Sequence, residues 1–183
     1  MTLEEFLALP ETRPAREYRD GKVTVRASPK AKHSVLQGAL VERLNRLALP
    51  ARVGFAFPEL RCTFAGSSFV FDIAFLAWDR IPRDSGGEVE DRVSTAPDLV
   101  IEILSPGQSR KRDIEKLEFS VRHGSRLGWF LDPRRKLVTV LRPDAPAVTL
   151  AEGDLDAARV LPGLTLGIAE VFGWLRLETP GAS

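Results

Sequence analysis

The chain has 183 residues, a formal net charge of +1 and a mean hydropathy of −0.08. These values are ordinary for a soluble globular protein, and they fit one domain over residues 1–183. No window approaches the roughly 18 consecutive apolar residues that a membrane span needs, so no membrane association is expected. The single cysteine, Cys62, excludes an intrachain disulfide and a cysteine-built zinc site. The N-terminus is acidic and lacks a signal-peptide pattern, so the cytoplasm is the expected location.

Charge is unevenly distributed along the chain. Basic residues are concentrated in residues 26–52 and 110–135, whereas residues 143–183 are mainly acidic. Two basic segments on either side of a site can hold a phosphate backbone. A charge run is equally typical of a solvated surface, so both interpretations stay open.

The N-terminal part predicts a short helix and a β-hairpin. Thr2 and Glu5 have the form of a capping box opening a helix that Pro10 stops. The dipeptide Asp20-Gly21 predicts a hairpin over residues 17–26. Glu17 either supplies an acid to a functional site or lies on an exposed strand edge.

A long helix is predicted from after Pro29 to Leu49, with leucines at helical spacing on one face. His33 lies near the start of this helix on the same face. A lone histidine there is either a satisfied core residue or a group oriented towards a phosphate or an acidic ligand.

The middle of the chain predicts two paired strands followed by a polar loop. Residues 53–63 read as a strand broken by Pro58, pairing with the apolar run Phe69–Ala77, which carries Asp72 at its centre. Residues 79–95 are polar and contain glycine, as expected for a mobile loop that contacts a substrate or a partner.

A strand–helix–strand crossover is predicted over residues 97–133. Its first strand, Leu99–Leu104, is apolar except for Glu102, and a second short strand covers residues 129–131. On the helix between them, Asp113 and Lys116 are three residues apart, so they either pair on the surface or Lys116 serves a site. Trp129 is expected in the core.

Asp72 and Glu102 each occupy the centre of a buried strand, where an unpaired charge is strongly unfavourable. One explanation is an ion pair with a nearby Arg or Lys, or a protonated acid. The other is a divalent cation held between the strands, since Mg²⁺ prefers one or two carboxylates plus water and phosphate oxygens. In the second case the metal-free protein should tolerate loss of either charge, whereas loss of an ion-pair partner should destabilise it by about 3–5 kcal/mol.

The last part predicts an antiparallel strand at 137–141 after a turn at 132–136, and a closing helix over residues 167–177. Together these elements predict an α/β fold with a mixed sheet.

The motifs together resemble the Uma2 family, a branch of the PD-(D/E)xK nuclease superfamily. They are the run EYRDG at 17–21, His33, Asp72, the run PDLVIEILSP at 97–106, Asp113-x-x-Lys116, Gly124, the run WFLDP at 129–133 and the run LPGL at 161–164. The chain departs from the superfamily pattern at Leu104, where a lysine is usual, and Lys116 matches the basic position that the family places on the helix.

The resemblance implies a restriction-endonuclease-like mixed sheet flanked by helices, with an N-terminal β-hairpin extension. It implies a metal-dependent endonuclease acting on DNA, in which Mg²⁺ or Mn²⁺ is bound by Asp72, Glu102 and the carbonyl of Ile103. Lys116 would stabilise charge on the phosphate or polarise the attacking water. Supporting positions would be Glu17, His33 and Asp113.

Two other functions stay open. One is a catalytically inactive module that keeps the nuclease fold and binds nucleic acid or protein, and the other is hydrolysis of a different phosphate ester. Assembly into a homo-oligomer is also left open.

Overall fold

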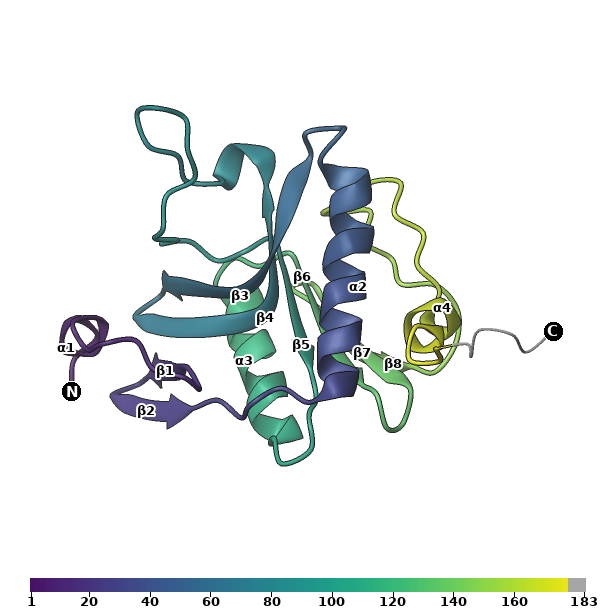
Figure 1. Ribbon diagram of the computed structural model, residues 1–183, viewed down its shortest axis with the longest axis horizontal. Helices are drawn as coiled ribbons and strands as arrows, with labels where there is room; N and C mark the ends of the chain where they lie inside the picture. Colours follow the sequence, from purple (N-terminus) through teal and green to yellow (C-terminus); the bar gives the residue numbers. More distant parts are fainter. Residues whose placement is uncertain (178–183) are drawn as a thin grey trace.

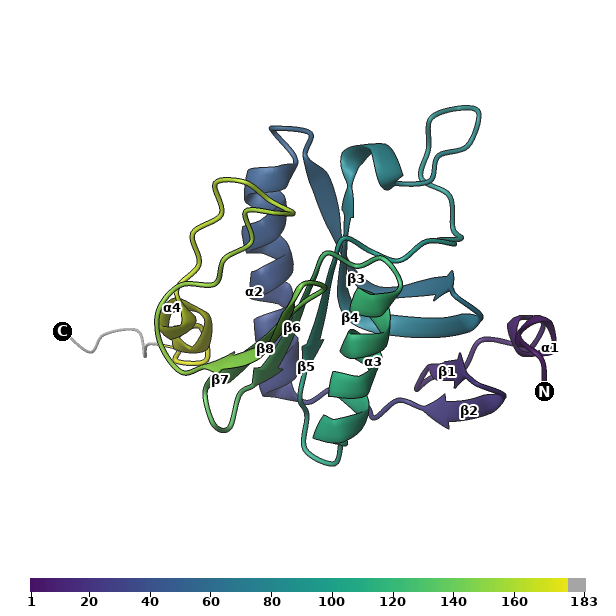
Figure 2. The same cartoon turned by 180° about the vertical axis from the view of Figure 1, so that it is seen from behind.

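The computed structural model describes residues 1–177, which form a mixed eight-stranded sheet with helices on both faces. Helix α2 (Ala31–Ala48) covers one face and helix α3 (Arg110–Arg122) covers the other, as the two opposite views show (Figures 1 and 2). The strand order is β2-β1-β4-β5-β6-β7-β8, with β3 paired to β4 outside this path. The predicted fold class, a restriction-endonuclease-like α/β sheet flanked by helices, is confirmed.

The crossover at the centre of the sheet is also confirmed. Strand β5 (Leu99–Ile103) runs parallel to β6 (Leu127–Asp132), and α3 connects them. Ser109 precedes helix α3 as its N-cap, and its side chain accepts a hydrogen bond from the Arg112 amide. Both faces of these strands are covered, which explains their nearly uninterrupted apolar sequences. Trp129 lies in the core, as predicted.

Strands β3 (Gly54–Phe64) and β4 (Ser67–Ala77) form a long antiparallel pair. The prediction that Pro58 would break β3 is wrong, because pairing with β4 continues on both sides of it. In β4, however, the order in which successive side chains point to the two faces of the sheet changes partway along the strand. Phe69 and Phe71 belong to the core beneath α3, whereas Ile73 and Phe75 belong to the core beneath α2. The change falls at Asp72.

The N-terminal elements agree with the sequence prediction. Helix α1 (Leu3–Leu7) starts with the complete Thr2–Glu5 capping box. Strands β1 (Arg16–Arg19) and β2 (Lys22–Val25) form the hairpin, and β1 joins the main sheet through the Tyr18–Ser68 pair. After β2 the chain crosses to the start of α2, below the end of β5 in Figure 1.

The C-terminal part differs more from the prediction. Strand β7 (Leu137–Arg142) pairs with β6 as expected, but an unpredicted edge strand, β8 (Ala145–Leu150), pairs with β7. The closing helix α4 is shorter than predicted and covers Ile168–Gly173, where its buried side chains pack into the core beneath α2.

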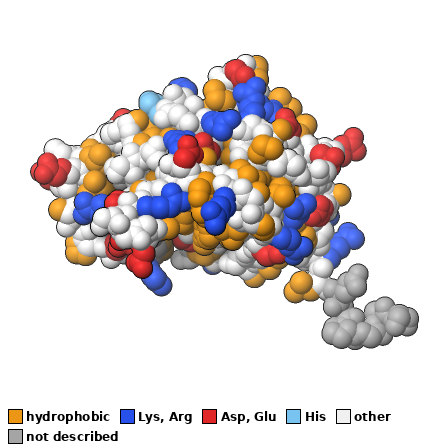
Figure 3. Space-filling model, turned by 90° about the horizontal axis from the view of Figure 1, so that it is seen from above, with side chains coloured by type: hydrophobic (Ala, Val, Ile, Leu, Met, Phe, Trp, Pro, Cys, Tyr) orange, Lys and Arg blue, Asp and Glu red, His pale blue; other side chains and the backbone are white. Residues whose placement is uncertain are grey.

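The segment between β4 and β5 contains a 3-10 turn, η1 (Trp78–Arg80), and an isolated bridge between Arg83 and Val89. Arg80, the last residue of η1, donates a 2.6 Å hydrogen bond to the buried carboxylate of Asp98 and so ties the start of this segment to its end. No helix within residues 1–177 is both long and apolar enough to cross a bilayer. On the face shown in Figure 3, basic and acidic side chains are interspersed among apolar ones.

Candidate active site

The site begins where β4 and β5 separate. Their pairing runs from Phe75–Leu99 to Ile73–Ile101 and then ends, so the next β5 amide facing β4, that of Ile103, has no strand partner on β4. Asp72 replaces that partner, because its Oδ2 accepts a hydrogen bond of 2.7 Å from the Ile103 amide. The side chain of Asp72 therefore takes the place of a backbone partner at the point where the two strands separate.

Asp72 is completely buried but has charged and polar partners on several sides. Its Oδ1 accepts a hydrogen bond from Arg26, and His33 Nε2 lies 3.0 Å from its Oδ2. Burial alone would raise the pKa of Asp72, but the His33 contact, the Arg26 charge and the Ile103 amide outweigh that effect and lower the pKa. Asp72 is therefore an ionised carboxylate.

His33 occupies the first turn of α2, and its side chain is 2% exposed. Of the two interpretations that the sequence left open, the structure places it against an acid, Asp72. Its Nδ1 has no hydrogen-bond partner. Gln37 lies one turn further along α2 and donates a 2.7 Å hydrogen bond to the backbone carbonyl of Asp72. The four-residue spacing from His33 to Gln37 was the available signal for this contact, which the sequence analysis missed.

Glu102 approaches the same region from the α3 side of β5. Its Oε1 lies 2.6 Å from Lys116 Nζ, and its Oε2 lies 3.9 Å from Arg26 Nη2. Burial raises the pKa of Glu102 to about 8, although the Lys116 charge opposes this shift. The two central acids therefore differ in character, since Asp72 is strongly ionised and Glu102 holds its proton more readily.

Lys116 does not lie on the surface, so a surface pair with Asp113 is excluded. Its Nζ is buried and lies 2.7 Å from both Glu17 Oε1 and the carbonyl of Val70. Burial alone would lower the pKa of Lys116, but Glu102 and Glu17 outweigh that effect and raise it. The ammonium ion is therefore fixed between two carboxylates.

Glu17 belongs to the site rather than to an exposed edge. It is 7% exposed, and its Oε1 also accepts a 3.0 Å hydrogen bond from the Val70 amide. Asp113 faces a hollow that Lys116 and Glu102 also line, but its Oδ2 has no hydrogen-bond partner. Burial raises the pKa of Asp113 to about 6.

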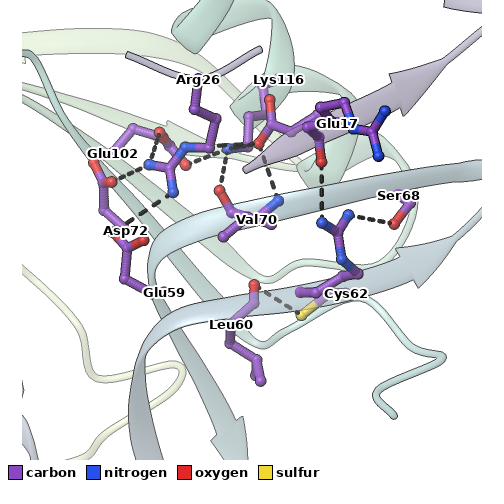
Figure 4. A network of polar contacts seen from close by, with 12 residues as sticks. Glu17, Arg26, Glu59, Leu60, Cys62, Ser68, Val70, Asp72, Glu102 and Lys116 are labelled. Atoms are coloured by element: carbon purple, nitrogen blue, oxygen red, sulfur yellow. Dashed lines mark hydrogen bonds and ion pairs between the residues drawn. The ribbon is translucent and has the colours of Figure 1, made fainter. Parts of the chain in front are cut away.

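Arg26, which was not predicted as a site residue, joins the two acids (Figure 4). It directly follows β2, and the Nη2 atom that contacts Asp72 is also the atom nearest to Glu102. Its Nε lies 4.0 Å from Glu17, and its Nη1 lies 3.6 Å from Glu59. Burial alone would lower the pKa of Arg26, but the surrounding acids outweigh that effect and raise the pKa above its ordinary value. No local pattern marks Arg26 as a site residue, because its contact with Asp72 spans 46 residues.

The carboxylates of Asp72 and Glu102 are compatible with a divalent cation in one respect. One oxygen of each carboxylate lies near the same atom, Arg26 Nη2. Carboxylate oxygens are the hard donors that Mg²⁺ prefers. Within residues 1–177 no group of three or more His, Cys, Asp or Glu side chains is placed to hold an ion. A cation here would depend on two carboxylates, a backbone carbonyl such as that of Ile103, and oxygens from water or substrate.

Comparison with known proteins identifies the family of the chain. The model of the Uma2 family, described as "Putative restriction endonuclease", matches residues 3–169. The chain belongs to the Uma2 family. The Uma2 match covers every residue of the site described above, from Glu17 to Lys116.

A crystal structure resembles this Uma2 chain over nearly its whole length. It is titled a putative nuclease belonging to DUF820 from Anabaena variabilis ATCC 29413. The two sequences are 40% identical, the match covers 96% of this chain and 99% of the other, and the TM-score is 0.94. Among curated proteins, none matches the chain.

Proposed function

We propose that the protein is a metal-dependent endonuclease that hydrolyses phosphodiester bonds in DNA, with Mg²⁺ or Mn²⁺ as the cofactor. The observation that carries this proposal is the convergence of Asp72 and Glu102 on one point where β4 and β5 separate. Membership of the Uma2 family, with the description quoted above, supports it.

The chain's own residues would divide the work as follows. Asp72 and Glu102, with the carbonyl of Ile103, would hold the cation. Such a cation supplies stabilisation of phosphate charge and activation of a water molecule. His33 orients Asp72 from the α2 side, and Lys116 provides a fixed positive charge near the phosphate that would lie at Glu102.

The test is cleavage of supercoiled plasmid DNA with Mg²⁺ and with excess EDTA. We expect Mg²⁺-dependent cleavage by the wild type and a loss of about 100-fold or more in Asp72→Asn and Glu102→Gln. Asp98→Asn is the matched control, because Asp98 is an equally buried carboxylate paired with an arginine outside the site. Full cleavage by Asp72→Asn, or equal losses in all three variants, would contradict the proposal.

A second candidate function is a non-catalytic module that binds nucleic acid. The observation in its favour is that Arg26 and Lys116 already neutralise the two acids, so that the fold is complete without a metal. In that case the wild type would bind DNA with an affinity that falls steeply as salt rises, and it would show neither cleavage nor stabilisation by Mg²⁺.

A further inference from the structure

The guanidinium of Arg26 lies at the point on which the two acids converge. Its Nη2 contacts Asp72 Oδ1 and lies 3.9 Å from Glu102 Oε2, and the side chain is only 9% exposed. We propose that Arg26 and the divalent cation are alternative occupants of the space between Asp72 and Glu102, so that the cation binds only when Arg26 leaves. This inference rests on the proposed function, because it concerns the same cation.

The hydrogen bonds of Asp72 explain why both cannot be present together. Its Oδ2 is already used by the Ile103 amide, with His33 Nε2 at 3.0 Å. The oxygen that remains available to a cation is Oδ1, and Arg26 occupies it. A monovalent and a divalent cation on one carboxylate oxygen would also repel each other strongly in a poorly solvated site.

Two hollows beside Arg26 provide space into which its side chain could move. It lines a hollow of about 800 Å³ together with Asp72 and His33, and it also lines a hollow of about 240 Å³ together with Glu102 and Lys116. Arg26 is thus part of the wall between the two hollows. Its withdrawal would connect them over both acids and leave a guanidinium beside the position of a substrate phosphate, which arginine binds well.

Two consequences follow for the protein without substrate. Arg26 stabilises the metal-free fold by compensating the acids, and it lowers the affinity of the acids for a metal. The effect of Arg26 should therefore appear in the affinity for the metal even where no DNA is present.

The experiment is a titration with MnCl₂ in the absence of nucleic acid, in which electron paramagnetic resonance measures the free Mn²⁺. Arg26→Gln is expected to bind Mn²⁺ roughly tenfold or more tightly than the wild type, within the usual range of coupling between two ligands. In thermal unfolding, the metal-free variant is expected to have a lower Tm than the wild type, and its Tm should rise more when Mn²⁺ is added. Arg80→Gln is the control, because it breaks a comparable ion pair with the buried Asp98 and should leave Mn²⁺ affinity unchanged.

A second measurement uses the wild type alone and does not depend on how well a variant folds. Modification of arginine by phenylglyoxal, located by mass spectrometry, should become faster at Arg26 when Mn²⁺ is added, because the guanidinium moves out of its buried contacts. Arg80 should react at the same rate with and without the metal.

The outcomes separate this inference from the proposed function. If the wild type binds Mn²⁺ but Arg26→Gln binds it equally or more weakly, or if Mn²⁺ leaves the reactivity of Arg26 unchanged, the inference is wrong and the metal site stands. If neither protein binds Mn²⁺, both the metal site and the inference are wrong. If Arg26→Gln binds more tightly but no DNA is cleaved, the inference holds and the nuclease function fails.

Discussion

Asp72 and Glu102 have similar places in the sequence but different surroundings in the fold. Asp72 has Arg26 and the Ile103 amide as hydrogen-bond donors, with His33 beside it, and these contacts lower its pKa. Glu102 has one short contact, to Lys116, and burial raises its pKa to about 8. The expectation that the metal-free protein would tolerate loss of either charge therefore needs revision for Asp72, which is a buried ion-pair partner.

We expect Asp72→Asn to lower the free energy of unfolding of the metal-free protein by about 3–5 kcal/mol, because the amide leaves the buried Arg26 without its nearest counter-charge. Glu102→Gln should have a clearly smaller effect near pH 7, because burial raises the pKa of Glu102 and so makes its charged form less favourable than that of Asp72. Urea unfolding of both variants in EDTA measures this difference. Equal destabilisation by the two changes would contradict it.

Asp113 contributes stability that depends on pH. Its pKa of about 6 in the folded protein lies above the ordinary value of 3.8. Below about pH 4 the side chain is protonated in both states and the contribution is complete. As pH rises through about 6, the unfolded chain releases this proton more readily, so the contribution is lost.

Replacement by Asn removes this titration. The stability of Asp113→Asn relative to the wild type should therefore rise by about 1–2 kcal/mol between pH 4 and pH 7.5. Urea unfolding at several pH values in that interval provides the measurement. A difference that stays constant over the interval would show that Asp113 ionises normally in the folded protein.

Two glycines show how differently the elements tolerate an added methyl group. At Gly54, the first residue of β3, a Cβ atom would lie 2.4 Å from the carbonyl oxygen of Leu76 and 2.5 Å from the Phe75 ring. At Gly38, on the exposed side of α2, nothing lies within 4 Å of that position. Gly54 therefore permits the close approach of β3 to β4, whereas Gly38 has no packing role and only lowers the stability of helix α2.

Gly54→Ala should accordingly destabilise the protein by about 1–3 kcal/mol, because a backbone carbonyl cannot move aside as a side chain can. Gly38→Ala should stabilise it by about 0.5–1 kcal/mol, because alanine reduces the entropy of the unfolded chain. Thermal or urea unfolding of the two single variants tests both signs. Stabilisation by Gly54→Ala would show that β3 can shift at this end.

Elements with strong local signals could be predicted from the sequence. The Thr2–Glu5 capping box, the Asp20-Gly21 turn and the crossover from β5 to β6 all have such signals, and all are confirmed. Strand β8 has none, because all its residues except Leu150 are exposed and they show no alternation. In β3, pairing with β4 overrides the local effect of Pro58.

At the scale of the whole molecule, the site joins segments that are far apart in the chain. Asp72, Glu102 and Lys116 could be selected from the sequence because two acids interrupt apolar strands and a family pattern includes the lysine. Arg26 could not, since nothing in residues 22–30 distinguishes an arginine that contacts β4 from one that faces solvent. Only the complete fold brings the segment after β2 against the end of β5 (Figure 1).

The hydrogen bond between Asp72 and the Ile103 amide has a consequence for how the family can change in evolution. Because Asp72 completes the bonding of β5, selection for folding alone is sufficient to retain it. Glu102 supplies no bond to the backbone of the sheet, so a descendant without the proposed reaction can exchange it more freely than Asp72. Among related sequences, a retained aspartate at this position is therefore weak evidence for the proposed activity, and a lost glutamate is stronger evidence against it.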